Sequence, residues 1–164
     1  MSINVAIIGS TGYTGTELVK ILIDHPKVNL KSLSSEKNYG KYLYDIFPHS
    51  YLKNLPKLEK NRDIDITNLD LVYIALPHVE SQKYIKNIIG KVRIIDLSAD
   101  FRLKNSLEYE KWYQNKHILK EIIPNFTYGL CEIYKESISK SVNISVPGCY
   151  PTSVLLPLIP ILKS

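Results

Sequence analysis

The sequence predicts an α/β fold with a mainly parallel sheet that is covered by helices on both faces. Three observations support this prediction. Short apolar runs typical of buried strands alternate along the chain with longer segments of helical periodicity. A glycine-rich segment joins the first predicted strand to the first predicted helix, as in folds that bind phosphate at a helix N-terminus. The length of 164 residues and the apolar content of 45% suit one globular domain.

The first two predicted elements have the clearest patterns. Residues 3–8 are an apolar run with β-branched residues, which predicts a strand that ends before Gly9. A helix is predicted over residues 17–23, because Leu18, Ile21 and Leu22 recur at the spacing of one buried helix face. The following His-Pro pair should end this helix.

The remaining elements are predicted from similar patterns, except in one segment. Residues 34–68 are rich in Lys, Tyr, Asn and Pro and have little periodicity, so they predict loops with one or two short elements. Further strands are expected at 28–33, 71–75, 92–96 and 143–146, further helices at 79–89, 107–116 and 132–140, and an apolar helical run at 150–162.

Composition and charge favour a protein that acts on a small molecule. The net charge is +5, but the lysines are spread along the chain, whereas nucleic-acid surfaces concentrate basic residues, so no nucleic-acid partner is expected. No apolar run approaches the roughly 20 residues that cross a bilayer, and no secretory signal is recognisable. We therefore expect a cytoplasmic protein without membrane contact. Cys131 and Cys149 have neither disulfide nor zinc spacing, and no metal is expected.

The glycine-rich segment has the context of a dinucleotide-binding turn. Gly9, Gly12 and Gly15 lie between a predicted strand and a predicted helix. Glycines at such a turn let the backbone approach a pyrophosphate, which then lies at the helix N-terminus. The spacing is GxxGxxG instead of the more common GxGxxG, so a glycine-rich turn without a ligand stays open as an alternative.

The residues after the second predicted strand favour NADP over NAD. An NAD site usually has an acidic residue at this place to bind a ribose hydroxyl, whereas this sequence has Ser34 and Ser35. Two hydroxyl groups with Lys37 nearby suit a 2′-phosphate, although Glu36 favours NAD if it points inward. After another predicted strand, Pro77 lies in a segment that we interpret as a turn above the cofactor.

A second candidate feature is Cys149, which precedes an apolar helical run and is expected at a helix N-terminus. Free N–H groups and the helix dipole favour a reactive thiolate there. A thiolate beside a hydride carrier suits the reduction of an acyl phosphate, because the thiolate can form a thioester that the hydride then reduces. A structural cysteine is the alternative, and Cys131, for which no helix N-terminus is expected, is interpreted in this way. Residues 96–103 are either part of a ligand site or a capping loop with an Asp–Arg pair.

Taken together, these motifs resemble the N-acetyl-γ-glutamyl-phosphate reductases, NADPH-dependent enzymes of arginine biosynthesis that are related to aspartate-semialdehyde dehydrogenase. The resemblance covers the whole chain. Its most specific parts are DLSADFRL at residues 96–103 and PGCYPT at residues 147–152. It implies an oxidoreductase with a Rossmann-like, doubly wound cofactor domain.

The resemblance also implies roles for individual residues. Cys149 would be the nucleophile, and Ser34 and Ser35 would lie at the 2′-phosphate of NADP. Glu36 stands where the family usually has Arg, and Lys37 is the expected replacement charge. The residues expected at the pyrophosphate are Gly9, Ser10, Thr11, Gly12, Tyr13, Thr14 and Gly15.

Two domains are implied as well. Residues 1–148 would form the NAD(P)-binding domain, and residues 149–164 would carry the nucleophile and the start of an α+β substrate domain that is otherwise missing. In the family, that second domain holds the acid–base histidine, much of the substrate pocket and the subunit interface of a homo-oligomer. The 164-residue chain alone is therefore expected to be inactive.

The reaction implied by the resemblance is the NADPH-dependent reduction of N-acetyl-glutamyl 5-phosphate to N-acetyl-glutamate 5-semialdehyde, with release of phosphate. Two alternatives stay open. One is a related acyl-phosphate reductase of the aspartate-semialdehyde or aminoadipyl type. The other is a stand-alone NADP-binding module or a remnant without catalysis.

Overall fold

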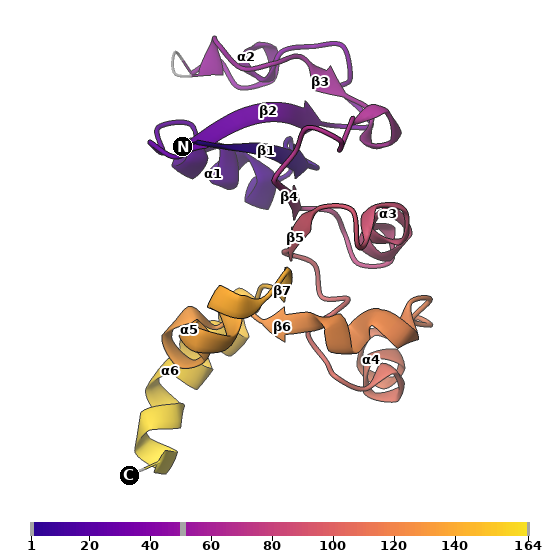
Figure 1. Cartoon of the computed structure of the whole chain (residues 1–164), viewed down its shortest axis with the longest axis vertical. Coiled ribbons are helices and arrows are strands. Elements are labelled where there is room, and N and C mark those ends of the chain that lie inside the picture. Colours follow the sequence, from indigo (N-terminus) through magenta and orange to yellow (C-terminus); the bar gives the residue numbers. More distant parts are fainter. Residues whose placement is uncertain (1, 50–51, 164) are drawn as a thin grey trace.

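The computed structural model describes residues 2–49 and 52–163, and its centre is one parallel sheet (Figure 1). Seven strands of the described residues form it in the order β3-β2-β1-β4-β5-β7-β6. The strands are β1 (Ile3–Ile8), β2 (Val28–Ser34), β3 (Leu58–Glu59), β4 (Leu71–Ile74), β5 (Arg93–Asp96), β6 (Phe126–Tyr128) and β7 (Asn143–Ser145). The helices are α1 (Tyr13–Leu22), α2 (Leu43–Ile46), α3 (Glu80–Ile88), α4 (Ser106–Tyr113), α5 (Cys131–Lys140) and α6 (Cys149–Lys163), with short 3₁₀ helices η2 (Asn61–Asp63) and η3 (Lys120–Asn125).

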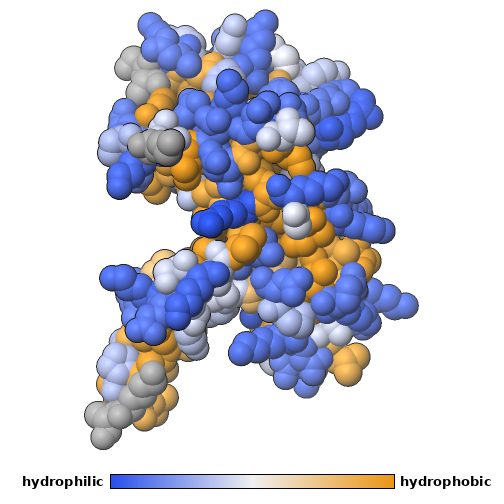
Figure 2. Space-filling model, viewed as in Figure 1, coloured by the Kyte–Doolittle hydropathy of each residue, from blue (hydrophilic) through white to orange (hydrophobic). Residues whose placement is uncertain are grey.

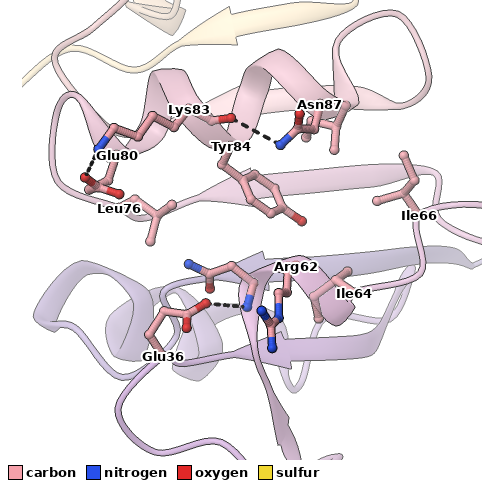
Figure 3. A pocket seen from close by; sticks show the side chains of 11 residues that line it. Glu36, Arg62, Ile64, Ile66, Leu76, Glu80, Lys83, Tyr84 and Asn87 are labelled. Carbon is pink, nitrogen blue, oxygen red and sulfur yellow. Dashed lines mark hydrogen bonds and ion pairs between the residues drawn. The ribbon is translucent and has the colours of Figure 1, made fainter.

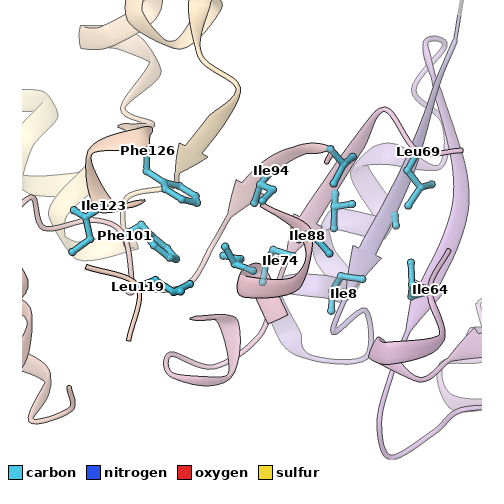
Figure 4. Packing of buried hydrophobic residues seen from close by; sticks show 14 residues of the cluster. Ile8, Ile64, Leu69, Ile74, Ile88, Ile94, Phe101, Leu119, Ile123 and Phe126 are labelled. Carbon is cyan, nitrogen blue, oxygen red and sulfur yellow. The ribbon is translucent and has the colours of Figure 1, made fainter. Parts of the chain in front are cut away.

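Side chains on both faces of the sheet are buried, which confirms the doubly wound architecture. In β1, Val5 and Ile7 belong to a buried cluster that includes α1, β2 and β3. The alternate residues Ala6 and Ile8 belong to a second cluster, which includes α3 and the segment around η3 (Figure 4). A strand that is buried on both faces reads as a continuous apolar run, as residues 3–8 do.

Most predicted elements are present, and the differences have local causes. Helix α1 begins at Tyr13, four residues before the predicted start, and its buried face is formed by residues such as Val19 and Leu22. The prediction that Ile21 lies on that face is wrong, since its side chain is 68% exposed. Strand β6 was not predicted, because its three residues pair only with β7 and carry no periodic signal.

The segment of residues 34–68 contains the short elements α2, β3 and η2, as expected, although residues 50 and 51 lie outside the described residues. Helix α6 extends away from the sheet (Figure 1), and neither buried cluster includes one of its described residues. Apolar side chains such as Ile161 and Leu162 are exposed on this helix. Figure 2 shows hydrophobic surface on the helix, in the lower left part of the view. Across residues 2–49 and 52–163, no helix has the length and apolar character needed to span a membrane.

All strand pairs are parallel, so the carboxyl ends of the strands meet at one edge of the sheet. The chain passes from β1 to β2 on one side and later continues with β4 on the other side of β1. This is a topological switch point, where open α/β sheets bind their ligands. The glycine-rich turn after β1 and the segment after β4 lie at that point.

A buried carboxylate organises the segment that follows β5. Asp100 is fully buried, and its carboxylate accepts hydrogen bonds from the Val79 N–H (2.9 Å), the Gln82 side chain (3.0 Å) and the Tyr109 hydroxyl (2.5 Å). Its carbonyl oxygen lies 2.9 Å from the His117 Nε2 atom. These contacts join α3 and α4 to the end of β5, far apart in the sequence.

We predict that Tyr109→Phe destabilises the protein by about 1–3 kcal/mol, because the buried Asp100 carboxylate loses a hydrogen-bond donor. The free energy of unfolding, measured by urea denaturation, checks this. Tyr13→Phe is the control, since Tyr13 is 97% exposed and its hydroxyl should contribute nothing measurable. Equal stabilities of the two variants would contradict the role of the buried network.

A second prediction concerns Asp96 at the end of β5. Burial, together with a smaller effect of the nearby Asp100 charge, raises its pKa to about 6, against the opposing effect of hydrogen bonds from Ser98 and Ser81. Between about pH 4 and pH 6 the folded protein keeps a proton that the unfolded chain releases, so this group makes stability fall as the pH rises. Above pH 6, where Asp96 is ionised in the folded protein, this effect lowers the free energy of unfolding by on the order of 3 kcal/mol.

Asp96→Asn removes this titration. The unfolding free energy of the variant minus that of the unsubstituted protein should therefore become more positive from pH 4 to pH 7. Urea denaturation at constant ionic strength measures the difference, with the exposed Asp24→Asn as the matched control. A difference that stays constant with pH would show that Asp96 is already ionised at pH 4.

Candidate cofactor and nucleophile sites

The glycine turn after β1 is held in very close contact with its surroundings. Gly9 has a φ of +85°, and a Cβ atom there would lie 2.5 Å from the carbonyl oxygen of Ala75, just after β4. A Cβ atom on Gly15 would overlap the carbonyl oxygen of Gly9. Both glycines are therefore required by the fold itself, because backbone atoms occupy the space of a side chain.

Gly12 is different, since the protein leaves room for a side chain at this position. Its φ and ψ angles of −75° and 163° are ordinary, and the nearest atom to an added Cβ would be 3.6 Å away. The residue is exposed and directly precedes α1, whose first N–H groups have no acceptor within the helix. A glycine that the fold does not need, at a helix N-terminus, fits the close approach of a pyrophosphate.

Ser34 and Ser10 support the turn from behind. The Ser34 hydroxyl accepts a hydrogen bond from the Gly9 N–H (3.2 Å) and donates one to Asn61 Oδ1 (2.7 Å). The Ser10 hydroxyl donates to the Ser34 carbonyl oxygen at 3.0 Å. Both serines are fully buried. The sequence pattern placed Ser34 at a phosphate, whereas in the structure its hydroxyl already has two protein partners.

Of the remaining predicted cofactor residues, Ser35 is also buried and the others are nearer the surface. The hydroxyls of Thr11 and Ser35 lie 2.8 Å apart, and Ser35 is 4% exposed. Tyr13 is 97% exposed, and Thr14 and Lys37 are exposed as well. The structure therefore brings the glycine turn and the end of β2 together at one side of the switch point.

Glu36 and Arg62 line a cavity of about 470 Å³ beyond the end of β2 (Figure 3). Glu36 Oε1 accepts a hydrogen bond from the Asn61 N–H at 2.8 Å. The opposite wall is formed by α3, where Lys83 pairs with Glu80 at 2.6 Å. Arg62 was not recognised from the sequence, because the η2 segment that carries it has no periodic pattern.

The segment after β4 forms a strained turn. Val79 has a φ of +70°, which is uncommon for a β-branched residue, and its N–H donates to the buried Asp100 carboxylate. Pro77 precedes this turn and is exposed, and its carbonyl oxygen accepts from the Ser81 N–H at 3.0 Å. Strain of this kind persists only where the surrounding structure holds it. The turn after β4 therefore has a defined position at the switch point of the sheet.

Both cysteines are exposed, and each is the first residue of a helix: Cys149 of α6 and Cys131 of α5. The expectation that Cys131 lacks a helix N-terminus is therefore wrong. The two sites differ in charge. Glu132 follows Cys131, whereas the first turn of α6 has no acidic residue. A helix start alone does not distinguish the two thiols.

Arg102 lies against the turn that leads to Cys149. Its Nη1 atom would be 2.9 Å from a Cβ on Gly148, and its guanidinium donates to the carbonyl oxygens of Val146 (2.7 Å) and Leu97 (2.9 Å). The Arg102 guanidinium thus binds backbone carbonyls and not the predicted Asp partner, whereas Asp100 accepts the Val79 N–H at the start of α3, as in the capping alternative. The arginine joins the segments that follow β5 and β7, and its guanidinium lies against Gly148, the residue before Cys149.

His117 is buried and both of its ring nitrogens contact backbone groups, whereas His78, after β4, is exposed. His117 is 1% exposed, its Nδ1 atom accepts from the Leu119 N–H, and burial lowers its pKa. The His78 ring lies 5.8 Å from the ring of Tyr113.

Comparison with known proteins agrees with this geometry. Residues 4–141 match the family model described as the NAD-binding domain of semialdehyde dehydrogenase. N-acetyl-gamma-glutamyl-phosphate reductase of Campylobacter jejuni (strain 81-176) is 46% identical over 99% of this chain and 47% of its own length. A probable chloroplastic N-acetyl-gamma-glutamyl-phosphate reductase of Arabidopsis thaliana is 40% identical over 99% of this chain and 40% of its own. The chain thus spans about half the length of these curated relatives, and the resemblance seen in the motifs is confirmed.

Solved structures show the same fold. Aspartate semialdehyde dehydrogenase II of Vibrio cholerae, complexed with ASA, has a TM-score of 0.73 at 19% identity, covering 100% of this chain and 47% of that one. The Candida albicans aspartate semialdehyde dehydrogenase with NADP has a TM-score of 0.67 at 14% identity, covering 99% and 47%. From the family match and the Rossmann-like architecture, we conclude that the chain belongs to the semialdehyde dehydrogenase family and contains its NAD-binding domain.

Proposed function

We propose that the chain serves in the NADPH-dependent reduction of N-acetyl-glutamyl 5-phosphate to N-acetyl-glutamate 5-semialdehyde, with release of phosphate. The observation that carries this proposal is the position of Cys149, an exposed thiol at the start of α6 and at the same sheet edge as the glycine turn. The names of the curated relatives support the choice of substrate.

In this proposal, the glycine turn and the first turn of α1 bind the pyrophosphate of the cofactor. Gly12 leaves the space that this approach needs. Ser35 and Lys37 lie near the adenosine ribose, Ser34 holds the turn in place, and Pro77 lies at the nicotinamide end. When bound, the cofactor supplies a hydride to the acyl carbon.

The chemistry of the protein is that of a thiolate. The Cys149 sulfur attacks the carbonyl carbon of the acyl phosphate, the C–O bond to phosphate breaks, and inorganic phosphate leaves with the electron pair. A thioester remains on Cys149. After hydride reaches its carbonyl carbon, the C–S bond breaks, so the aldehyde leaves and the thiolate is restored.

Arg102 supports this chemistry from the turn before the nucleophile. Its guanidinium is held by two backbone carbonyls, so it contributes a fixed positive charge beside Gly148. A nearby cation favours a thiolate over a thiol. We also propose that residues 1–148 form the cofactor domain and that residues 149–164 begin the substrate-binding part. A group elsewhere in the full-length relatives would then manage the proton transfers.

A prediction about the glycine turn follows. Gly12→Val should leave the protein folded but weaken NADPH binding by at least about tenfold, because a β-branched side chain occupies the approach to the helix N-terminus. Fluorescence titration measures the affinity and circular dichroism the fold. Gly15→Ala is the contrasting variant, which should lower the thermal unfolding temperature because its Cβ overlaps the backbone. Unchanged NADPH affinity in folded Gly12→Val would mean that the turn is only structural.

A prediction about the thiol tests the proposed reaction. Incubation with N-acetyl-glutamyl 5-phosphate should add one acyl group, seen by intact mass, and release one phosphate. Cys131→Ser should retain both signals, and Cys149→Ser should lose both. Iodoacetamide at neutral pH should also modify Cys149 before Cys131, because Arg102 lies near the first and Glu132 beside the second.

Two results would contradict this part of the proposal. One is acylation of Cys131 at the rate of Cys149. The other is the lack of any acyl adduct in Cys131→Ser that still binds NADPH.

A further inference from the structure

The cavity beyond β2 lies beside the glycine turn. It has a volume of about 470 Å³ and lies between η2 and α3, with apolar walls that include Ile64, Leu76 and Ile88 (Figure 3). It is linked to the glycine turn by hydrogen bonds, since Asn61 of its wall binds Ser34, which binds the Gly9 N–H. Apolar walls beside a phosphate-binding turn suit a planar base, and the charged rim would then meet the groups on its ribose.

Glu36 is held at this rim by the backbone. Its Oε1 atom accepts the Asn61 N–H at 2.8 Å, and Asn61 is itself fixed through its side chain to the buried Ser34. Moving the carboxylate away would break this hydrogen bond. A 2′-phosphate at this rim needs a cation that offsets the charge of Glu36.

Of the two cations that line the cavity, Arg62 has fewer constraints than Lys83. Its side chain is 77% exposed, and its ion pair with Asp63 is long (3.5 Å) and exposed. Lys83, across the cavity, is paired with Glu80 at 2.6 Å. Lys60 lies over the ring of Tyr39, at 4.2 Å from its centroid. Surface pairs such as that of Arg62 are weak, so its guanidinium can exchange Asp63 for a stronger partner.

We propose that Arg62 binds the 2′-phosphate of the cofactor and thereby makes the cavity selective for NADPH in spite of Glu36. This inference rests on the proposed use of NADPH. A guanidinium pairs with phosphate through two parallel hydrogen bonds, which a lysine cannot form. In this arrangement Glu36 orders the η2 segment through its hydrogen bond with the Asn61 N–H. Arg62, the next residue of that segment, then provides the selectivity for NADPH.

The test is a titration of the purified protein with NADPH and with NADH, followed by fluorescence. Arg62→Gln should weaken NADPH binding by about ten- to a hundredfold, the loss of a charge-assisted hydrogen-bonded pair, and leave NADH binding within about twofold. The NADPH affinity of Arg62→Lys should lie between that of the unsubstituted protein and that of Arg62→Gln. Lys83→Gln is the matched control, which removes one exposed lysine at the cavity and should change the NADPH to NADH ratio by less than about threefold, and Lys37→Gln tests the rival cation.

A second measurement uses salt. The selectivity of the unsubstituted protein for NADPH should fall as the ionic strength rises, and that of Arg62→Gln should change little. Thermal unfolding should be the same for both proteins, because the Arg62 side chain is exposed.

The outcomes separate this inference from the proposed function. If the unsubstituted protein binds neither dinucleotide, the proposed function fails. If it binds NADPH and Arg62→Gln weakens both dinucleotides equally, or neither, the role of Arg62 is refuted while the proposed function stands. A selective loss in Lys37→Gln instead would assign the phosphate to Lys37, and tighter binding of NADH than NADPH would show that Glu36 governs the site.

Discussion

The close contact between the glycine turn, the end of β4 and the start of α1 is the constraint on which the rest of the structure depends. Backbone atoms occupy the space that side chains would need at Gly9 and Gly15. Because nothing lies between these three segments, α1 begins directly at the switch point of the sheet. The first N–H groups of α1, which have no acceptor within the helix, then lie at that point. A single methyl group at either glycine would move the helix away from that position.

From this turn, a series of hydrogen bonds carries the same geometry to the cavity beyond β2. The Gly9 N–H binds Ser34, Ser34 binds Asn61, and the Asn61 N–H binds Glu36. The buried polar groups thus determine where the exposed charged groups lie. The residues around the glycine turn have two different roles, which the sequence alone could not distinguish. Ser34 is buried and supports the backbone, whereas the outer residues of the turn are accessible to a ligand.

What the sequence predicted well is what depends on local pattern. Strand β1, the glycine turn and the alternation of strands and helices follow from short-range spacing, and the structure has them. Strand β6 and the contacts of Asp100 depend on partners far along the chain, so no local signal marks them. The buried face of α1 was misjudged for a related reason. The close packing at Gly15 sets the rotation of the helix, and it turns Ile21 to the solvent.

The cysteines show where inference from a local motif needs the surrounding charges. Both thiols are exposed and each is the first residue of a helix, so the helix start alone does not distinguish them. The difference lies in neighbours that the fold assembles. At Cys149 the guanidinium of Arg102, fixed by carbonyls after β5 and β7, lies against the preceding turn, whereas Glu132 stands beside Cys131. Strands β6 and β7 are parallel and both end at the edge where the glycine turn lies, so the two cysteines follow strands that end there, and what differs between them is the neighbouring charge. The fold, more than the helix start, therefore distinguishes the proposed nucleophile from its counterpart.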